Sequence, residues 1–394
     1  MNLTTSCKNL PRAMIAVVPC FDEPDTCKAL KSLADCFRPS LPAEVIFVVN
    51  YGEQVEEEAK LRCAKNYEEA CDFARRFSRP DFVVSPRFVP DMPRKHAGVG
   101  LARKIGMDEA ARRLHPKGLI LCCDADAEYD RNYFIAIEKY FKENPRTEAG
   151  SIYFEHPVEG DEYPKEIYEG IIKYELHLRY YNQAQRWAGL PFAWHTVGSA
   201  MFCTAETYLK AGGMNRRKAG EDFYFLQKLI PHVHFAEINS TRVIPSPRIS
   251  TRVPFGTGRA MLKYIDGEDI LTYSLEAFVP LGELVKTVPE LYRADKILQG
   301  KILRRFHPRF ALYLKSINFY AAIDELNENC ADYKSFEKRF FTWFNAFRTL
   351  KYLNEAHLDF FPKAPVAKEA SKLLRIENIN PKEILEQYRI KDRT

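Results

Sequence analysis

Short apolar runs alternate with amphipathic segments over the first 125 residues. Two early runs are almost continuously apolar, and the second is rich in β-branched and aromatic residues, which is typical of strands buried in a parallel sheet. The segments between the runs carry apolar residues at helical spacing. The pattern predicts strands over residues 13–21, 44–50, 81–85 and 118–124. It predicts helices between them, over residues 24–37, 54–77 and 98–114.

This alternation predicts an α/β fold, with a mostly parallel sheet flanked by helices. Ligands of such sheets bind at the carboxyl ends of the strands. From about residue 258 the strand signals fade, and residues 309–328 and 334–356 carry aromatic and aliphatic residues three and four positions apart, as packed helices do. We therefore expect two domains, residues 1–257 and a mostly helical appendage at 258–394.

Composition places the chain among globular proteins. Of its 394 residues, 46% are hydrophobic and 28% are charged, and the net charge of +5 gives no specific support for nucleic-acid binding. The apolar runs are shorter than the roughly 20 residues that a membrane span requires. Pro11 and Arg12 interrupt the N-terminal segment, which therefore does not resemble a signal peptide. We expect a cytoplasmic protein.

Two carboxylates follow the last predicted strand, in the segment CCDADAEYD. Asp124 and Asp126 are separated by one residue, so both can reach one site and offer oxygen ligands to Mg²⁺ or Mn²⁺. The alternative is that they cap the following helix. An EF-hand is excluded because Tyr129 stands where its glycine is required and Ile135 where its glutamate is required. A dinucleotide-binding loop is excluded because PCFDEP, after the first strand, has no G-x-G-x-x-G.

A second acidic pair begins a later amphipathic segment. Glu221 and Asp222 follow a Gly-Gly turn in GGMNRRKAGEDFYFLQKL, and acidic residues are favoured there by the helix dipole alone. The functional interpretation is a general base that faces a bound cation. A basic segment, SPRISTRVPFGTGR, follows at residues 246–259. Its arginines could bind phosphate oxygens, or the segment could be an ordinary connector to the helical region.

Taken in order, these motifs resemble a family-2 glycosyltransferase with the GT-A (Rossmann-like) fold, over about residues 13–255. PCFDEPDTCKALKSL resembles the opening segment of that family, which lines the nucleotide pocket. GLARKIGMDEA resembles its Ala-Arg-Asn-x-Gly helix, CDADA its D-x-D motif, and GSAMF, GGMN and GEDFYFLQKL its acceptor-side segment.

The resemblance implies a role for each matching residue. Asp126 becomes the principal ligand of a divalent cation, Mn²⁺ or Mg²⁺, with help from Asp124. Asp222 becomes the general base, with Glu221 beside it. The resemblance and the basic segment together give the residues that we expect to bind the nucleotide sugar. These are Pro19, Phe21, Glu23, Asn50, Arg103, Asp124, Arg248 and Arg252.

Three positions depart from the family pattern. Lys104 replaces the Asn that follows the helix arginine. Asn50 stands where an acidic residue commonly contacts the base or ribose, and Asn can hydrogen-bond but carries no charge. Some members supply a metal-binding His after the acidic helix, whereas Ser246 and Arg248 stand in that neighbourhood here.

The expected function is therefore metal-dependent transfer of a sugar from a nucleotide-diphosphate sugar to an acceptor hydroxyl, with inversion. The acceptor could be a glycan, a lipid-linked molecule or a small molecule. A sugar nucleotidyltransferase and a non-catalytic nucleotide-sugar- or partner-binding protein stay open. No membrane span is expected, but peripheral membrane contact could come from the basic residues Lys301, Arg304, Arg305, Arg309 and Lys338, which solvated helix faces also explain.

Overall fold

The chain forms two compact units. The computed structural model describes residues 10, 13–252, 256–377 and 379–394. One unit, called the sheet unit here, comprises the chain up to Ile171, Thr196–Leu262 and Asp392–Thr394. The other, the helical unit, comprises Ile172–His195 and Lys263–Lys391. The chain passes between the two units after Ile171, His195, Leu262 and Lys391. The third of these crossings lies near the boundary expected at 257/258, whereas no periodicity indicated that Ile172–His195 belongs to the helical unit.

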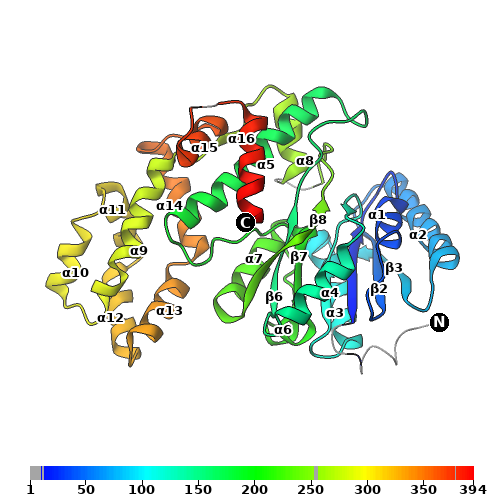
Figure 1. Ribbon diagram of the computed structural model, residues 1–394, viewed down its shortest axis with the longest axis horizontal. Coiled ribbons are helices and arrows are strands. Elements are labelled where there is room, and N and C mark those ends of the chain that lie inside the picture. Colours follow the sequence, from blue (N-terminus) through cyan, green and yellow to red (C-terminus); the bar gives the residue numbers. More distant parts are fainter. Residues whose placement is uncertain (1–9, 11–12, 253–255, 378) are drawn as a thin grey trace. The chain divides into compact units, whose positions relative to one another are not determined.

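The sheet unit is built on an eight-stranded sheet of order β3-β2-β1-β4-β7-β6-β8-β5 (Figure 1). Strands β3, β2, β1 and β4 are parallel, and β7 runs antiparallel to both of its neighbours. The predicted α/β class is confirmed, and the sheet is mixed beyond β4. The strands are β1 (Met14–Cys20), β2 (Ala43–Gly52), β3 (Phe82–Met92), β4 (Leu119–Cys122), β5 (Glu128–Tyr129), β6 (Ala149–Phe154), β7 (Met201–Thr204) and β8 (Phe235–Ile244).

Helices flank this sheet in the predicted alternation. Helix α3 packs closely against β1, because a Cβ added to Gly106 would lie only 2.4 Å from Cγ1 of Val17. The helices are α1 (Cys27–Ala34), α2 (Glu57–Phe77), α3 (Val99–Arg113), α4 (Tyr133–Glu143), α6 (Ala205–Lys210) and α7 (Glu221–Leu229), with 3-10 turns η3 (Gly198–Ala200) and η4 (Ile230–His232). Three further helices among the described residues cross between the units, α5 (Lys165–Trp187), α8 (Thr257–Ile265) and, in its last turn, α16 (Pro381–Arg393).

The helical unit buries the aromatic residues that the sequence spacing indicated. Phe310 packs on Tyr352 with ring centroids 4.7 Å apart, and both side chains are buried. The two long periodic segments are each divided into two helices, the first at Asn318, which has a positive φ of 61°. The elements are β9 (Leu271–Thr272), η5 (Leu275–Phe278), α9 (Val279–Leu291), α10 (Lys296–Leu303), α11 (Pro308–Ser316), α12 (Phe319–Asn329), α13 (Tyr333–Trp343), α14 (Ala346–Asp359), β10 (Ala364–Pro365), α15 (Val366–Leu374) and α16 (Pro381–Arg393).

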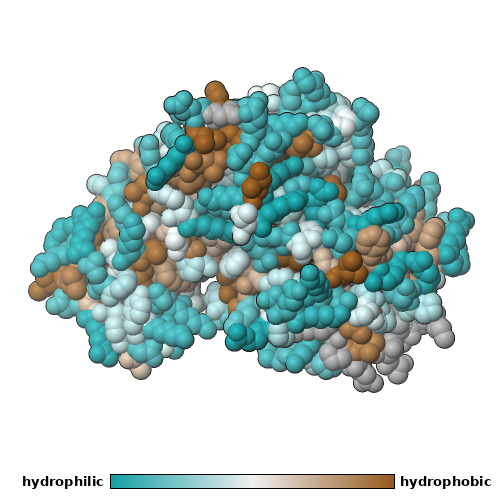
Figure 2. Space-filling view, in the orientation of Figure 1, coloured by the Kyte–Doolittle hydropathy of each residue, from teal (hydrophilic) through white to brown (hydrophobic). Residues whose placement is uncertain are grey.

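Most of the surface visible in Figure 2 is hydrophilic, with apolar side chains in small groups. The largest fully buried side chains include Phe47 and Phe82 in the sheet unit and Tyr313 and Tyr352 in the helical unit, so each unit has its own core. Within the described residues, no helix has both the length and the apolar character needed to cross a membrane.

Candidate active site

The carboxyl ends of β2, β1 and β4 meet at one edge of the sheet. The parallel register pairs Cys20 with Val49 and Val17 with Cys122, so the loops after these strands begin at a similar height. Phe21 and Glu23 follow β1, and Asp124 and Asp126 follow β4. These four residues therefore lie at the sheet edge at which the sequence analysis expected a ligand, and their role there stays a prediction.

The guanidinium of Arg103 connects the D-x-D segment to the start of α7. This side chain, on α3, is only 2% exposed. Its NH2 donates to Oδ1 of Asp124 at 2.8 Å, and its Nε donates to Oε1 of Glu221 at 3.3 Å. Its NH1 donates to the carbonyl oxygen of Gly198 at 2.9 Å. Because the charge is buried between two carboxylates, it fixes the relative position of three separate segments.

Asp222 is adjacent to this bridge. Its Oδ1 accepts a hydrogen bond from the backbone N–H of Phe223 at 2.7 Å. Burial, and then the nearby negative charge of Glu221, raises the pKa of Asp222 to about 7. Gly198 leaves room for this arrangement, since a Cβ there would lie 3.1 Å from both Oδ2 of Asp222 and NH2 of Arg103. A carboxylate with a pKa near neutrality is suited to accept a proton in catalysis.

Asp126 takes part in a second charged cluster. Nε of Arg248 lies 2.7 Å from Oδ2 of Asp126, and its NH2 lies 2.7 Å from Oε2 of Glu23. Arg252 also pairs with Glu23, and its guanidinium carbon lies 5.8 Å from the ring centroid of Phe21. Burial raises the pKa of Asp126 to about 6, although Arg248 acts in the opposite direction. The basic segment after β8 therefore lies over the predicted metal ligand.

The loop that carries Phe21 and Glu23 is held by residues that the sequence analysis did not name. Asn66 accepts from the backbone N–H of Glu23 at 3.0 Å and donates to the carbonyl of Glu23 at 2.8 Å. Arg62 donates to Asp22 at 2.9 Å. Asn66 lies on the buried stripe of α2, with Cys63 and Ala70. A polar residue within an apolar helical stripe is the signal that could have identified it.

Three predicted nucleotide-sugar residues do not face an open site. Pro19 lies within β1 and is buried. Asn50 is 3% exposed, and its amide nitrogen donates to the carbonyls of Cys20 and Val48 at 2.9 and 3.2 Å. Arg103 is committed to the contacts described above. These residues therefore brace the site, whereas Phe21, Glu23, Asp124, Arg248 and Arg252 have side chains that are partly exposed or lie in its charged cluster.

The donors fit a divalent cation whose remaining ligands come from outside the protein. Within the described residues, no group of three His, Cys, Asp or Glu side chains is close enough to hold a metal ion. Asp126 and Asp124 offer hard carboxylate oxygens, and Mg²⁺ in nucleotide sites is held by one or two carboxylates together with substrate phosphates. A cation at Asp126 would exchange places with the Arg248 guanidinium.

Several solved structures are similar to this chain, with TM-scores below 0.5. The S. aureus TarS 1-349 complex with UDP-GlcNAc is 13% identical, with a TM-score of 0.42, and the match covers 84% of this chain and 92% of that one. The mannosyltransferase PcManGT from Pyrobaculum calidifontis, in complex with GDP-Man and Mn²⁺, is 14% identical, with a TM-score of 0.35 and coverage of 90% and 89%. GalNAc-T7 with UDP, GalNAc and Mn²⁺ is 14% identical, with a TM-score of 0.38 and coverage of 66% and 48%.

No protein-family model and no curated protein sequence matches the chain. The TM-scores of these three structural matches lie below 0.5, so the matches do not establish a function for this chain.

Proposed function

We propose that the sheet unit is a glycosyltransferase, which moves a sugar from a nucleotide-diphosphate sugar to an acceptor hydroxyl with inversion at the anomeric carbon. The observation that carries the proposal is the buried Arg103 guanidinium, which contacts both Asp124 and Glu221. These two carboxylates belong to the motifs that resemble the donor and acceptor segments of family-2 glycosyltransferases. One buried charge thus supports a single site built from both segments.

The donor is proposed to lie along the carboxyl ends of β1 and β4. Phe21 and Glu23 are available to the nucleotide, and Arg248 and Arg252 to its diphosphate. Guanidinium groups pair with phosphate oxygens in a bidentate manner, so the diphosphate would replace Asp126 and Glu23 as their partner. This exchange would also free Asp126.

Asp222 is proposed as the general base. The acceptor O–H proton moves to a carboxylate oxygen of Asp222, and the acceptor oxygen forms a bond to the anomeric carbon. The bond between that carbon and the phosphate oxygen breaks, and its electron pair leaves with the nucleoside diphosphate. Arg248 and Arg252 are positioned to stabilise the charge that develops on the departing diphosphate. The pKa of Asp222, about 7, supports the role because a base near the working pH is efficient.

Asp126, assisted by Asp124, is proposed to hold a divalent cation, Mn²⁺ or Mg²⁺. When bound, the cation would supply positive charge beside the diphosphate oxygens and so weaken the bond to the sugar. Arg103 keeps Asp124 oriented for this role through its 2.8 Å contact.

The proposal is tested by thermal stability against UDP-, GDP-, dTDP- and CMP-sugars, with and without Mn²⁺, for the full chain and for Asp126→Asn. A ligand at about 100 times its dissociation constant adds roughly 2.7 kcal/mol, which raises the melting temperature by several degrees. Asp72→Asn is the matched control, because Asp72 is exposed on α2 and pairs only with Arg75 among the described residues. We expect a metal-dependent shift with one nucleotide, retained in the control and lost in Asp126→Asn.

Nucleoside diphosphate release from the stabilising donor is then measured. Release that requires Asp222 would support transfer. Stabilisation without any release would favour a nucleotide-sugar-binding protein. Pyrophosphate release from a nucleoside triphosphate and a sugar phosphate would show a nucleotidyltransferase and overturn the proposal.

A further inference from the structure

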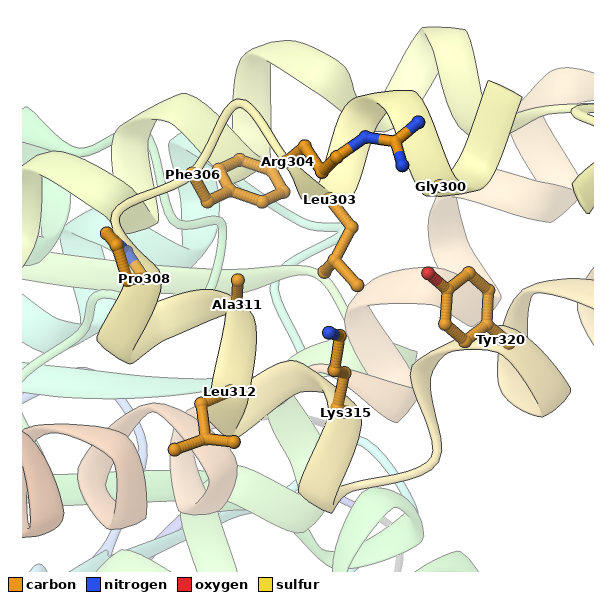
Figure 3. A pocket seen from close by; sticks show the side chains of 9 residues that line it. All are labelled: Gly300, Leu303, Arg304, Phe306, Pro308, Ala311, Leu312, Lys315 and Tyr320. Carbon is orange, nitrogen blue, oxygen red and sulfur yellow. The ribbon is translucent and has the colours of Figure 1, made fainter. Parts of the chain in front are cut away.

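The helical unit contains a cavity that the site described above does not use. It has a volume of about 540 Å³, within the 300–1,000 Å³ range of small-molecule sites. Helices α10, α11 and α12 and the turn between α10 and α11 form its wall (Figure 3). Its lining residues are Gly300, Leu303, Arg304, Phe306, Pro308, Ala311, Leu312, Lys315 and Tyr320.

Two cations and a phenol line this cavity without partners of their own. Within the described residues, the Arg304 guanidinium, the Lys315 ammonium and the Tyr320 hydroxyl make no hydrogen bond or ion pair, and none of the lining residues is acidic. Figure 3 shows the three groups on one side of the cavity, with the ends of Lys315 and Tyr320 turned towards the space between them. All three groups can donate hydrogen bonds to an anionic ligand.

The opposite side of the cavity is apolar. Figure 3 shows Phe306, Pro308 and Ala311 together there, with Leu312 below Ala311 and with Leu303 between Phe306 and Tyr320. Leu303 and Phe306 are buried, whereas Leu312 is 58% exposed. An exposed leucine beside an open apolar wall is a surface that an alkyl chain could cover. The cavity therefore has a cationic end and an apolar end.

The positions of the two cations on their helices do not by themselves explain this arrangement. Arg304 is the C-cap of α10, and Lys315 lies in the last turn of α11, where positive charge is favoured by the helix dipole. The dipole accounts for each charge separately. It does not account for two helix ends that meet at one cavity beside the Tyr320 hydroxyl and an apolar wall.

Neighbouring basic residues differ from these two in having acidic partners. Arg305 pairs with Glu290 at 2.8 Å, and Arg309 lies 3.6 Å from Glu355. Lys296, whose ammonium lies 5.7 Å from the Tyr320 ring centroid, pairs with Asp324. The unneutralised charge of this region is therefore concentrated at Arg304 and Lys315 on the cavity wall, together with Lys301 on α10.

We propose that this cavity binds an anionic amphiphile, in which a phosphate or carboxylate head contacts Arg304, Lys315 and Tyr320 and an alkyl chain covers Pro308, Ala311 and Leu312. The proposal goes beyond glycosyl transfer and does not depend on it. It also gives the predicted peripheral membrane contact a defined location on α10 and α11.

Calorimetric titration of the full chain with octyl phosphate tests this site, with inorganic phosphate and 1-octanol as the separate head and tail. We expect octyl phosphate to bind at least about tenfold more tightly than either part, because each buried CH₂ adds to affinity. Arg304→Gln and Lys315→Gln should each weaken binding about tenfold. Leu312→Ser should weaken the binding of octyl phosphate but leave the affinity for inorganic phosphate unchanged.

Lys338→Gln is the matched control, since Lys338 is exposed on α13 and does not line the cavity. The four substituted side chains, those of Arg304, Leu312, Lys315 and Lys338, are exposed. Their replacement should therefore leave the fold intact, which a thermal melt verifies. Absence of octyl phosphate binding, equal affinity for inorganic phosphate, or equal loss in Lys338→Gln would each overturn the proposal.

Such a head group could belong to a membrane lipid or to a soluble amphiphile. Vesicles of phosphatidylcholine with and without phosphatidic acid distinguish these two sources. Sedimentation with phosphatidic acid vesicles that Lys315→Gln reduces, and that octyl phosphate displaces, would identify a membrane lipid as the source. Binding of octyl phosphate without sedimentation would identify a soluble amphiphile. Sedimentation that Lys338→Gln reduces as much as Lys315→Gln would show general attraction to a charged surface and overturn the site.

Discussion

Nε of Arg248 lies 2.7 Å from Oδ2 of Asp126, so a guanidinium neutralises the carboxylate that the motif analysis assigned to a metal ion. Arg248 also contacts Glu23. The same carboxylate oxygen cannot be fully committed to Arg248 and to a cation. The two positive charges are therefore alternatives at Asp126.

Arg248→Gln should consequently tighten Mn²⁺ binding in the absence of donor. A hydrogen bond to a charged group contributes about 1.5–3 kcal/mol, so we expect about a tenfold or greater decrease in the dissociation constant, measured by calorimetry. Affinity for the nucleoside diphosphate should fall in the same variant, because a phosphate-binding guanidinium is lost. Arg75→Gln, which also removes a guanidinium from an aspartate, should change neither. Unchanged Mn²⁺ affinity in Arg248→Gln would refute the competition.

Asp222→Asn should abolish transfer and preserve donor binding. The amide keeps the shape of the side chain and can still accept from the Phe223 N–H, but it cannot take a proton at neutral pH. Loss of a general base costs about 10²–10⁴-fold in rate. Product release should therefore fall by that factor, while the thermal shift with donor and Mn²⁺ stays as in the wild type. Near-normal turnover would remove Asp222 from its proposed role.

The wild-type rate should rise with pH through about 7. Below this value Asp222 is protonated, since burial and then the charge of Glu221 raise its pKa to about 7, and the protonated acid cannot serve as a base. In a profile of kcat/KM against pH, the rising limb should report the pKa of Asp222. A rate that is flat between pH 5 and pH 8 would contradict the assignment.

The same pKa has an opposite effect on stability. The folded protein binds the Asp222 proton more tightly than the unfolded chain, in which an aspartate has a pKa of about 3.9. Its contribution to stability is therefore lost as pH rises from about 4 to about 7. Asp222→Asn cannot titrate, so urea unfolding should show the variant gaining stability relative to the wild type from pH 5 to pH 8. A constant difference across that range would show that the pKa is not raised.

Much of the fold could be read from the sequence, because buried strands and amphipathic helices have distinct periodicities. Helix α2 ends at Phe77 as expected, and Asp124 and Asp126 follow a buried strand. Motif order also led us to expect Asp124 and Glu221 near one site, and both carboxylates contact Arg103. A periodicity describes one segment only, however, so it could not predict that β7 runs antiparallel to β4 or that the predicted helical segment at residues 309–328 divides at Asn318.

Contacts between distant residues were the least predictable part of the site. Arg248 and Asp126 are 122 positions apart, and no local pattern indicates which carboxylate an arginine in a basic loop will contact. Asn50 stands at a position where the family commonly has a nucleotide-binding acidic residue, yet its amide nitrogen donates to the backbone carbonyls of Cys20 and Val48. Which side chains remain available to a ligand depends on burial and on partners, which only the assembled sheet defines.

Arg103 provides the strictest test of the site as one structure. Replacement by Gln leaves Asp124 and Glu221 without their shared cation, and Glu221 is buried. Removing one partner of a buried ion pair typically costs about 3–5 kcal/mol, which urea denaturation of the sheet unit within the full chain would measure. Arg103→Lys should recover charge but not both contacts, because an ammonium lacks the fork of a guanidinium. Its stability should therefore lie between those of Arg103→Gln and the wild type, with turnover still strongly reduced. If Arg103→Lys regained full turnover, the geometry of the guanidinium would not be what joins the two acidic segments.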